Sequence, residues 1–284
     1  MADSNPRQTG VIPGTVVIRP STGLLGRNVR DLWPFRELAF FLTWRDVKVR
    51  YRQSVLGAAW AIIQPIMMMV VFSVVFGHYA KLPSDGVPYP IFTFAALVPF
   101  TYFTSALTGS AASLVGNANL VSKVYFPRLL LPIAAAIGPL VDFAIAMVVL
   151  AIMMAAYGVS PTIGLVTLPA LMLVSIATAL GAGALLAALN VRYRDFQYVV
   201  PYTVQFLLYA TPVAYSAQLV PKGAQAFLGV NPMATVVAGF RWALLGTPAP
   251  GPGMVGISIC VTAAVLVAGL IYFQRVEKTF ADVI

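Results

Sequence analysis

The stretch FRELAFFLTWRDVKVRYRQSVLGAAWAIIQP, residues 35–65, joins two unlike halves. Its first half carries five basic residues among Trp and Phe, and an uncharged run begins at about residue 55 and ends at residue 77. A helix that crosses a membrane needs about 20 mostly apolar residues, which only the second half supplies. The stretch therefore predicts a charged, amphipathic helix that leads into the first of several membrane spans.

The composition of the whole chain agrees with a membrane protein. Of the 284 residues, 60% are hydrophobic and only 10% are charged, and the mean hydropathy is +0.86. Soluble domains carry about 25% charged residues. A soluble fold of this composition would expose large apolar patches to water. We therefore expect an all-α integral membrane protein.

Uncharged stretches that are long enough to cross a membrane predict six spans. They cover about residues 55–77, 90–115, 129–156, 163–189, 197–217 and 253–274. Only Asp142 places an ionisable group inside one of them, which makes it a candidate functional residue. No other expected span supplies an ionisable partner, so we interpret Asp142 as hydrogen-bonded to a neighbouring helix. A proton relay is the alternative.

The basic residues predict how the spans are oriented. The net charge is +9, and the 18 Lys and Arg residues gather in alternate loops. Fifteen fall on the side of the N-terminus, and three fall on the other side: Lys81, Lys222 and Arg241. Because basic loops stay in the cytoplasm, we expect both termini to be cytoplasmic. We expect the membrane to be the cell inner membrane. A basic face against anionic lipid explains the charge better than nucleic acid, which we do not expect as a partner.

Residues 31–53 are too charged to span but rich in aromatic residues. At about 100° per residue, five of the apolar side chains share one narrow sector: Trp33, Phe40, Trp44, Val47 and Tyr51. We expect an interface helix in the plane of the cytoplasmic membrane surface. A solvated tail is the alternative, and the Trp and Phe residues argue against it. Residues 1–30 precede the helix as a cytoplasmic tail without an assigned role.

Residues 218–248 are mostly apolar but do not form one continuous helical segment. Asn231 suits a helix N-cap, Pro232 suits the first helical position, and Gly246 suits a left-handed C-terminal turn. The 14 residues between the caps would be about 21 Å long, too short to cross. We therefore expect short, re-entrant outer gate helices between spans five and six. If the segment did cross, the number of spans would be odd.

The sequence carries no energy-coupling or catalytic motif. It contains no GxxxxGK[ST], HExxH or GxSxG, and it has one Cys and one His. A membrane glycosyl- or acyltransferase would show clustered acids or histidines. We therefore expect no catalytic residue, no metal site and no cofactor in this chain.

Four stretches in order resemble the type-2 ABC export permeases for polysaccharides, in particular the O-antigen subgroup and its teichoic-acid relatives. The first is residues 35–65, quoted above. The others are LVSKVYFPRLLLP (120–132), NVRYRDFQYVVPYTVQFLLYATPVAYS (190–216) and NPMATVVAGFRWALLG (231–246). The resemblance covers the chain from about residue 30 to its end.

This resemblance implies a homodimer of six-span subunits that works with two copies of a separate ATPase subunit, which binds ATP and Mg. It also implies an undecaprenyl-diphosphate-linked glycan as cargo, drawn through a channel at the dimer interface. Loops 117–128 and 190–197 would lie near the ATPases. The residues expected there are Lys123, Phe126, Arg128, Arg192, Tyr193, Arg194 and Asp195.

By the same analogy, basic residues of the interface helix would attract the lipid diphosphate: Arg45, Lys48, Arg50 and Arg52. Ordinary cytoplasmic anchoring explains the same residues. Rings in and near spans two and five offer flat apolar faces to sugars and are candidate channel residues: Phe100, Tyr102, Phe103, Phe206, Tyr209 and Tyr215.

Two other functions stay open. A type-2 ABC permease for a drug or a lipid would share this architecture. A secondary transporter would need ion coupling through Asp142 and no ATPase. The sequence does not identify the glycan, its terminal cap or the resting state of the channel.

Overall fold

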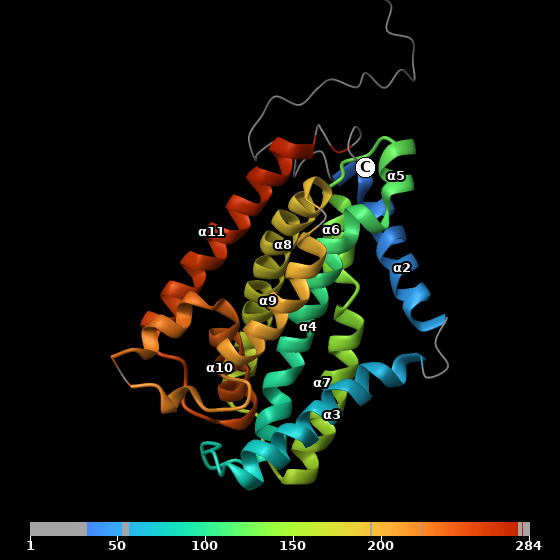
Figure 1. The fold of residues 1–284 in the computed structure, drawn as a ribbon. Helices are drawn as coiled ribbons and strands as arrows, with labels where there is room; N and C mark the ends of the chain where they lie inside the picture. Colours follow the sequence, from blue (N-terminus) through green and yellow to red (C-terminus); the bar gives the residue numbers. More distant parts are fainter. Residues whose placement is uncertain (1–32, 53–56, 194, 222, 278–279, 281–284) are drawn as a thin grey trace, which may run out of the picture.

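The computed structural model describes residues 33–52, 57–193, 195–221, 223–277 and 280 (Figure 1). Across these residues all regular structure is helical, which confirms the all-α prediction. Most of the long helices run side by side as one bundle (Figure 1). The short helix α5 (Ala118–Lys123) lies at one end, which we call the α5 end, and α10 (Pro232–Leu245) lies toward the opposite end.

Five helices are long and apolar enough to cross a membrane, and each overlaps an expected span. They are Trp60–Tyr79 (α3, Trp60–Phe72, with the π-helix Ser73–Tyr79), Tyr89–Gly116 (α4), Leu130–Tyr157 (α6, Leu130–Ile137, with α7, Leu140–Tyr157), Ile163–Arg192 (3-10 turn Ile163–Thr167 with α8, Leu168–Arg192) and Pro252–Val276 (α11). The remaining elements are α2 (Arg36–Arg52), α9 (Phe196–Ala210) and 3-10 turns at Trp33–Phe35, Gly57–Ala59, Ala217–Leu219 and Gln225–Val230.

The one remaining expected span, the fifth (residues 197–217), contains a shorter helix. α9 has 15 residues, or about 22 Å at the standard rise, which is less than a span requires. The chain then becomes extended at Thr211, and Pro212 and Val213 are buried against the bundle. The structure therefore supports five spans by length and composition, and the span at residues 197–217 stays a prediction.

Helix α4 forms the centre of the bundle. It is buried along most of its length and contacts α3, α6, α7, α8, α9 and α10. One core cluster joins its Phe94 and Val98 to Leu150 of α7 and Phe240 of α10. Because other helices cover α4 on nearly every side, only one face of α4 is available to contact molecules outside the bundle.

Helices α8 and α11 touch through their backbones at a glycine pair. A Cβ on Gly269 would lie 2.0 Å from the carbonyl oxygen of Gly181, and a Cβ on Gly181 would lie 2.5 Å from the Cα of Leu266. Small residues allow this approach between membrane helices, where van der Waals packing drives association.

We predict that Gly269→Ala lowers the thermal unfolding midpoint of the detergent-solubilised protein. The new methyl group must push α8 and α11 apart, at a cost of about 1–3 kcal/mol for an overpacked site. Gly256→Ala on the same helix is the control, because nothing lies within 4 Å of its Cβ. Equal midpoints for the two variants would contradict the packing.

Helix α10 confirms the predicted caps. The side chain of Asn231 accepts a hydrogen bond from the Met233 N–H at 3.1 Å, Pro232 is the first helical residue, and Gly246 closes the helix with φ 72°. Nearly every residue of α10 is buried, among α4, α8 and α11. Short helices and irregular backbone at depth are tolerated where protein covers them, as here. Its role as a gate stays a prediction.

Arg241 of α10 holds this end of the bundle together, a role that the sequence did not indicate. Its side chain, 3% exposed, donates to the carbonyls of Phe92 (3.0 Å), Pro212 (2.6 Å), Val213 (2.5 Å) and Tyr215 (3.1 Å). Its guanidinium also lies 3.5 Å from the ring centroid of Phe92. The residue therefore ties α10 to the start of α4 and to the extended segment after α9.

We predict that Arg241→Met destabilises the protein more than Arg241→Lys, because each buried carbonyl left without a donor costs about 1–3 kcal/mol. An ammonium group cannot reproduce the planar fork of the guanidinium, so Lys recovers only part of the loss. Thermal unfolding measures the effect, and the exposed Arg52→Met is the control. Equal midpoints for Arg241→Met and the control would remove Arg241 from this role.

Candidate functional site

Helix α2 carries apolar side chains on more than one face, so the prediction of an amphipathic helix with a single apolar sector is not confirmed. Leu42 is fully buried and packs in a cluster with Leu130 and Leu131 of α6. Trp33, which precedes α2, and Phe40 and Trp44 of the predicted aromatic sector are exposed. Their exposure fits contact with lipid. Figure 1 shows α2 running along the edge of the bundle from the α5 end toward the start of α3; its angle to the membrane plane stays a prediction.

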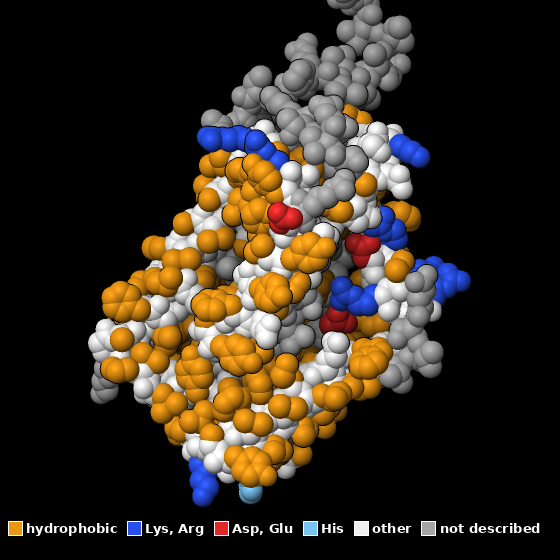
Figure 2. Space-filling view, in the orientation of Figure 1, with side chains coloured by type: hydrophobic (Ala, Val, Ile, Leu, Met, Phe, Trp, Pro, Cys, Tyr) orange, Lys and Arg blue, Asp and Glu red, His pale blue; other side chains and the backbone are white. Residues whose placement is uncertain are grey.

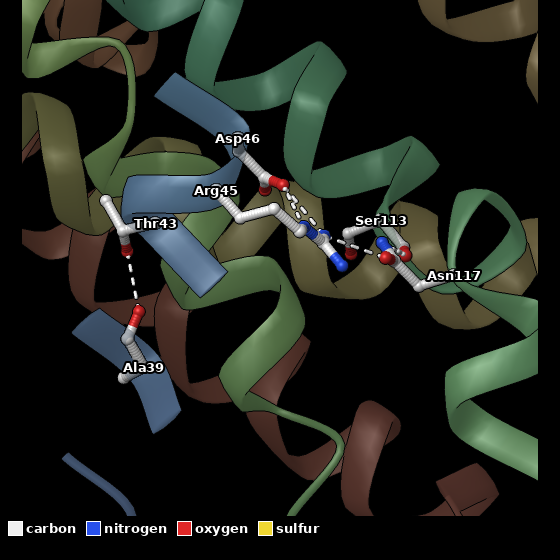
Figure 3. Close-up of polar contacts among 6 residues, drawn as sticks. All are labelled: Ala39, Thr43, Arg45, Asp46, Ser113 and Asn117. Atoms are coloured by element: carbon white, nitrogen blue, oxygen red, sulfur yellow. Dashed lines mark hydrogen bonds and ion pairs between the residues drawn. The ribbon is translucent and has the colours of Figure 1, made fainter. Parts of the chain in front are cut away.

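Arg45 joins α2 to the start of α5. Its guanidinium donates to the Asp46 carboxylate (3.0 and 2.7 Å) and to the side-chain oxygen of Asn117 (2.8 Å), as Figure 3 shows. Asn117 in turn donates to the Ser113 carbonyl at 2.8 Å (Figure 3). Arg45 was expected to attract a diphosphate, but in this conformation its donors serve the protein.

Arg50 and Tyr51, at the other end of α2, bind Asp142 of α7. The guanidinium of Arg50 donates to one carboxylate oxygen and the hydroxyl of Tyr51 donates to the other. Burial, together with the hydrogen bond to Asp142, raises the pKa of the Tyr51 hydroxyl, which therefore stays protonated and able to donate. The expected bond from Asp142 to a neighbouring helix is confirmed, but its partner is α2 rather than another span.

Lys48 and Arg52 differ from the other two basic residues of α2. Both are exposed, and among the residues that the structure describes neither has an ion-pair partner. Of the four residues expected to attract a diphosphate, only these two have unengaged charges.

A cavity of about 600 Å³ lies behind the Arg50–Asp142 pair, between the end of α2 and helices α3, α4, α7 and α9. The Ser and Thr side chains in its lining come from α4, and the amide comes from α3: Thr101, Thr104, Ser105, Thr108 and Gln64. Rings also contribute: Tyr51, Trp60, Tyr102 and Phe143. The cavity combines polar groups, ring faces and one neutralised charge pair.

Two of the six candidate channel rings are core residues, which corrects the expectation for them. Phe100 and Phe103 of α4 are 4% and 3% exposed and pack against neighbouring helices of the same chain. Because α4 is central, most of its rings are covered. Tyr102 is also buried and donates to the Ala136 carbonyl at 3.1 Å, yet it contributes to the cavity wall. Tyr215 is partly buried.

The other two candidate rings belong to an exposed stripe on α9. Tyr198, Tyr202, Phe206 and Tyr209 are between 64% and 73% exposed. Spacings of four, four and three residues place them on one side of the helix. Val204 of the same helix lines the cavity. Figure 2 shows hydrophobic side chains over most of one face, with charged groups mainly at the α5 end and beside α2.

At the α5 end, two of the expected ATPase-facing residues instead fix the protein's own structure. Phe126 is buried in a cluster with Leu42, which corrects its assignment to a docking surface. The backbone N–H of Arg128 donates to the Glu277 carboxylate at 3.0 Å, and its side chain donates to the Glu277 carbonyl. Burial raises the pKa of Glu277, although Arg128 opposes this shift. Glu277, directly after α11, is thereby held against Arg128 of loop 117–128.

Among the described residues, the others expected near the ATPases are exposed. Lys123 lies at the end of α5, and Arg192 lies at the end of α8, 5.4 Å from the Tyr193 ring centroid. Tyr193 is half-exposed, and Asp195 is exposed at the start of α9. Arg194 lies outside the described residues. Lys123 and Arg192 therefore offer free charge at this end.

We predict that Asp142→Asn lowers the unfolding midpoint, because a charge-assisted acceptor for Arg50 and Tyr51 becomes a neutral one, at a cost of about 1–3 kcal/mol. The charge swap Arg50→Asp with Asp142→Arg should recover part of the loss. A proton-relay role for Asp142 predicts otherwise: Asp142→Asn would abolish transport at unchanged stability, and the swap would not rescue transport.

Taken together, the fold and these surfaces define a multi-pass helical membrane protein with a charged N-terminal helix, a cavity between its helices and a charged end. Comparison with known proteins makes the class specific. The family model for the ABC-2 type transporter matches residues 37–245, so the chain belongs to the ABC-2 type transporter family. It is accordingly a transporter permease subunit.

Individual relatives match nearly the full length. The chain is 28% identical to the O-antigen export system permease protein RfbA of Myxococcus xanthus, over 90% of this chain and 98% of that protein. It is 24% identical to the O-antigen export system permease protein RfbA of Klebsiella pneumoniae, over 87% and 95% of the two chains. It is 23% identical to the polysialic acid transport protein KpsM of Escherichia coli, over 84% and 93%.

Proposed function

We propose that this chain is the transmembrane subunit of an ATP-driven exporter that moves an undecaprenyl-diphosphate-linked polysaccharide of the O-antigen type across the inner membrane. The observation that carries the proposal is the nearly full-length match to permeases named for O-antigen export. The sequence has no P-loop, so a separate ATPase subunit would bind ATP and Mg. Two copies of each subunit and cytoplasmic termini complete the proposal.

The exposed ring stripe of α9 supports a channel between two copies. Four rings that cover one side of a short helix offer flat faces to another chain or to sugars. The cavity lies beside this stripe, because Val204 of α9 is in its wall. A second copy placed against this side would enclose the cavity and the stripe in one conduit.

The free charges of α2 support an approach route for the cargo. Lys48 and Arg52 are exposed at the end of α2 that leads to the cavity, where Arg50 lies. Exposed cations near the membrane surface attract anionic headgroups. A lipid diphosphate held there would have its glycan within reach of the cavity.

Co-purification from the source organism tests the proposal. The tagged chain is purified with the products of neighbouring genes, and bound proteins and lipids are identified by mass spectrometry. A stoichiometric Walker-motif subunit and a polyprenyl-linked glycan are expected, together with loss of surface glycan when the gene is deleted. Absence of an ATPase partner, with surface glycan unchanged on deletion, would overturn the proposal.

We predict that Lys123→Glu with Arg192→Glu uncouples the permease from its ATPase. Reversing both free charges of the α5 end should lower export about tenfold, equivalent to about 1.4 kcal/mol of coupling. The amount of protein in the membrane should stay the same, because both side chains are exposed. Lys81→Glu, an exposed charge near the opposite end, is the control. Unchanged export in the double variant would remove these residues from coupling.

A further inference from the structure

The polar wall of the cavity is the feature that the proposed function leaves unexplained. Thr101, Thr104, Ser105 and Thr108 follow one another at i, i+3, i+4 and i+7, so they share one face of α4. Gln64 of α3 lines the same cavity. This is the least covered face of a helix that is otherwise buried.

Most of these polar groups lack a protein partner. Thr104 donates to the Thr101 carbonyl at 3.1 Å. Within the described part of the chain, the side chains of Gln64, Thr101, Ser105 and Thr108 make no hydrogen bond.

The hydroxyls of Ser73, Thr93 and Ser258 are buried without a partner among the described residues, but several hydroxyls in other helices bond their own backbone. Examples are Thr43 on Ala39, Thr178 on Val174 and Thr203 on Val199. Such back-bonding is the usual solution for a helical Thr or Ser in an apolar setting. Its absence at Thr101, Ser105 and Thr108 leaves donors and acceptors of the cavity wall available to a ligand.

The rest of the lining narrows the chemistry of that ligand. Trp60, Tyr102 and Phe143 supply ring surface. Among the described residues, the charged side chains in the lining are Arg50 and Asp142, which neutralise each other. A lipid chain would leave the hydroxyls and the amide unpaired, at about 1–3 kcal/mol each. A sugar ring suits this lining, because it presents hydroxyl edges and apolar C–H faces, which ring side chains accommodate.

We propose that this cavity is a carbohydrate site, in which Gln64, Thr101, Ser105 and Thr108 bind the hydroxyl groups of one sugar residue of the cargo. The inference rests on the proposed function and assigns the polar contacts of the conduit to a single subunit. Each hydroxyl and the amide both donates and accepts, which matches sugar hydroxyls. The volume of about 600 Å³ falls within the range of about 300–1,000 Å³ of small-molecule sites.

The absence of a net charge has a consequence for transport. Neutral hydrogen bonds exchanged with water contribute only about 0.5–1.5 kcal/mol each. Such a site binds each sugar residue of the polymer weakly and releases it so that the following sugar residue can bind, as passage of a polymer requires. A strongly charged site would retain the chain.

Removal of the hydroxyls tests the site. In the deletion strain, wild type, the triple variant Thr101→Val, Ser105→Ala, Thr108→Val, and the control Thr203→Val are compared. Surface glycan is normalised to the amount of subunit in the membrane. The triple variant should export at least tenfold less while it retains its ATPase partner. The control, whose hydroxyl bonds its own helix, should export as wild type.

The outcomes separate the inference from the proposed function. If deletion of the gene leaves surface glycan unchanged, the proposed function fails. If deletion abolishes it but the triple variant exports as wild type, the carbohydrate site is wrong and the proposed function stands.

Photo-cross-linking reads occupancy of the cavity without relying on export. p-Benzoylphenylalanine replaces Val204, which lines the cavity, or Val148, an exposed residue of α7 outside it. Illumination of cells should give a periodate-sensitive glycan adduct at position 204 and none at 148, and the triple variant should reduce it. An adduct with phospholipid alone, or a glycan adduct that the triple variant leaves intact, would overturn the assignment.

Discussion

A polar side chain inside a lipid bilayer has no water to bond, so it must find its partner within the protein. Most of this structure can be understood from that requirement. The Asp142 carboxylate is paired by Arg50 and Tyr51, and the Arg241 guanidinium by four backbone carbonyls. Each of these contacts joins segments that are distant in the sequence. Burial of polar groups thereby fixes the positions of α2 and α10.

The cavity wall on α4 departs from this requirement. Among the described residues, the side chains of Gln64, Thr101, Ser105 and Thr108 make no hydrogen bond and line a cavity, whereas the unpaired hydroxyls of Ser73, Thr93 and Ser258 are buried. Unpaired polar groups that line a cavity are expected where water or cargo passes. The same reasoning therefore identifies the fixed parts of the subunit and the part that meets a ligand.

Helix α2 connects the proposed ATPase-facing end of the subunit to the cavity. Arg45 binds Asn117 beside α5, where an ATPase would dock, and Arg50 lies in the cavity wall. A rigid helix moves as one body, so a displacement at one of its ends also displaces the other end. The two contacts thus provide a physical route between the motor and the cargo path.

Much of the fold followed from the sequence because apolar length and helix caps are local properties. Five spans and the capped helix α10 were predicted from uncharged runs and from Asn231, Pro232 and Gly246. The fifth expected span was harder, because α9 ends at Ala210 although its apolar run continues to residue 217.

Side-chain partners were less predictable, because they depend on which helices are neighbours. The sequence offered Asp142 no partner within the other expected spans. Its partner Arg50 lies on helix α2, 92 positions away in the sequence. Arg241 counted only as an outer charge, and Phe100, Phe103 and Phe126 are packed inside the subunit. For the cavity, the spacing of Thr101, Thr104, Ser105 and Thr108 was visible in the sequence. The sequence did not show that this face of α4 lines a cavity.

Transport by the purified complex in inside-out vesicles tests the account most directly. The subunit and its ATPase are reconstituted with lipid-linked glycan from the source organism, and glycan protected from an added glycosidase is measured. We expect protected glycan to accumulate only with ATP and Mg and only when both subunits are present. Accumulation without the ATPase, or none with the full complex, would contradict an ATP-driven exporter.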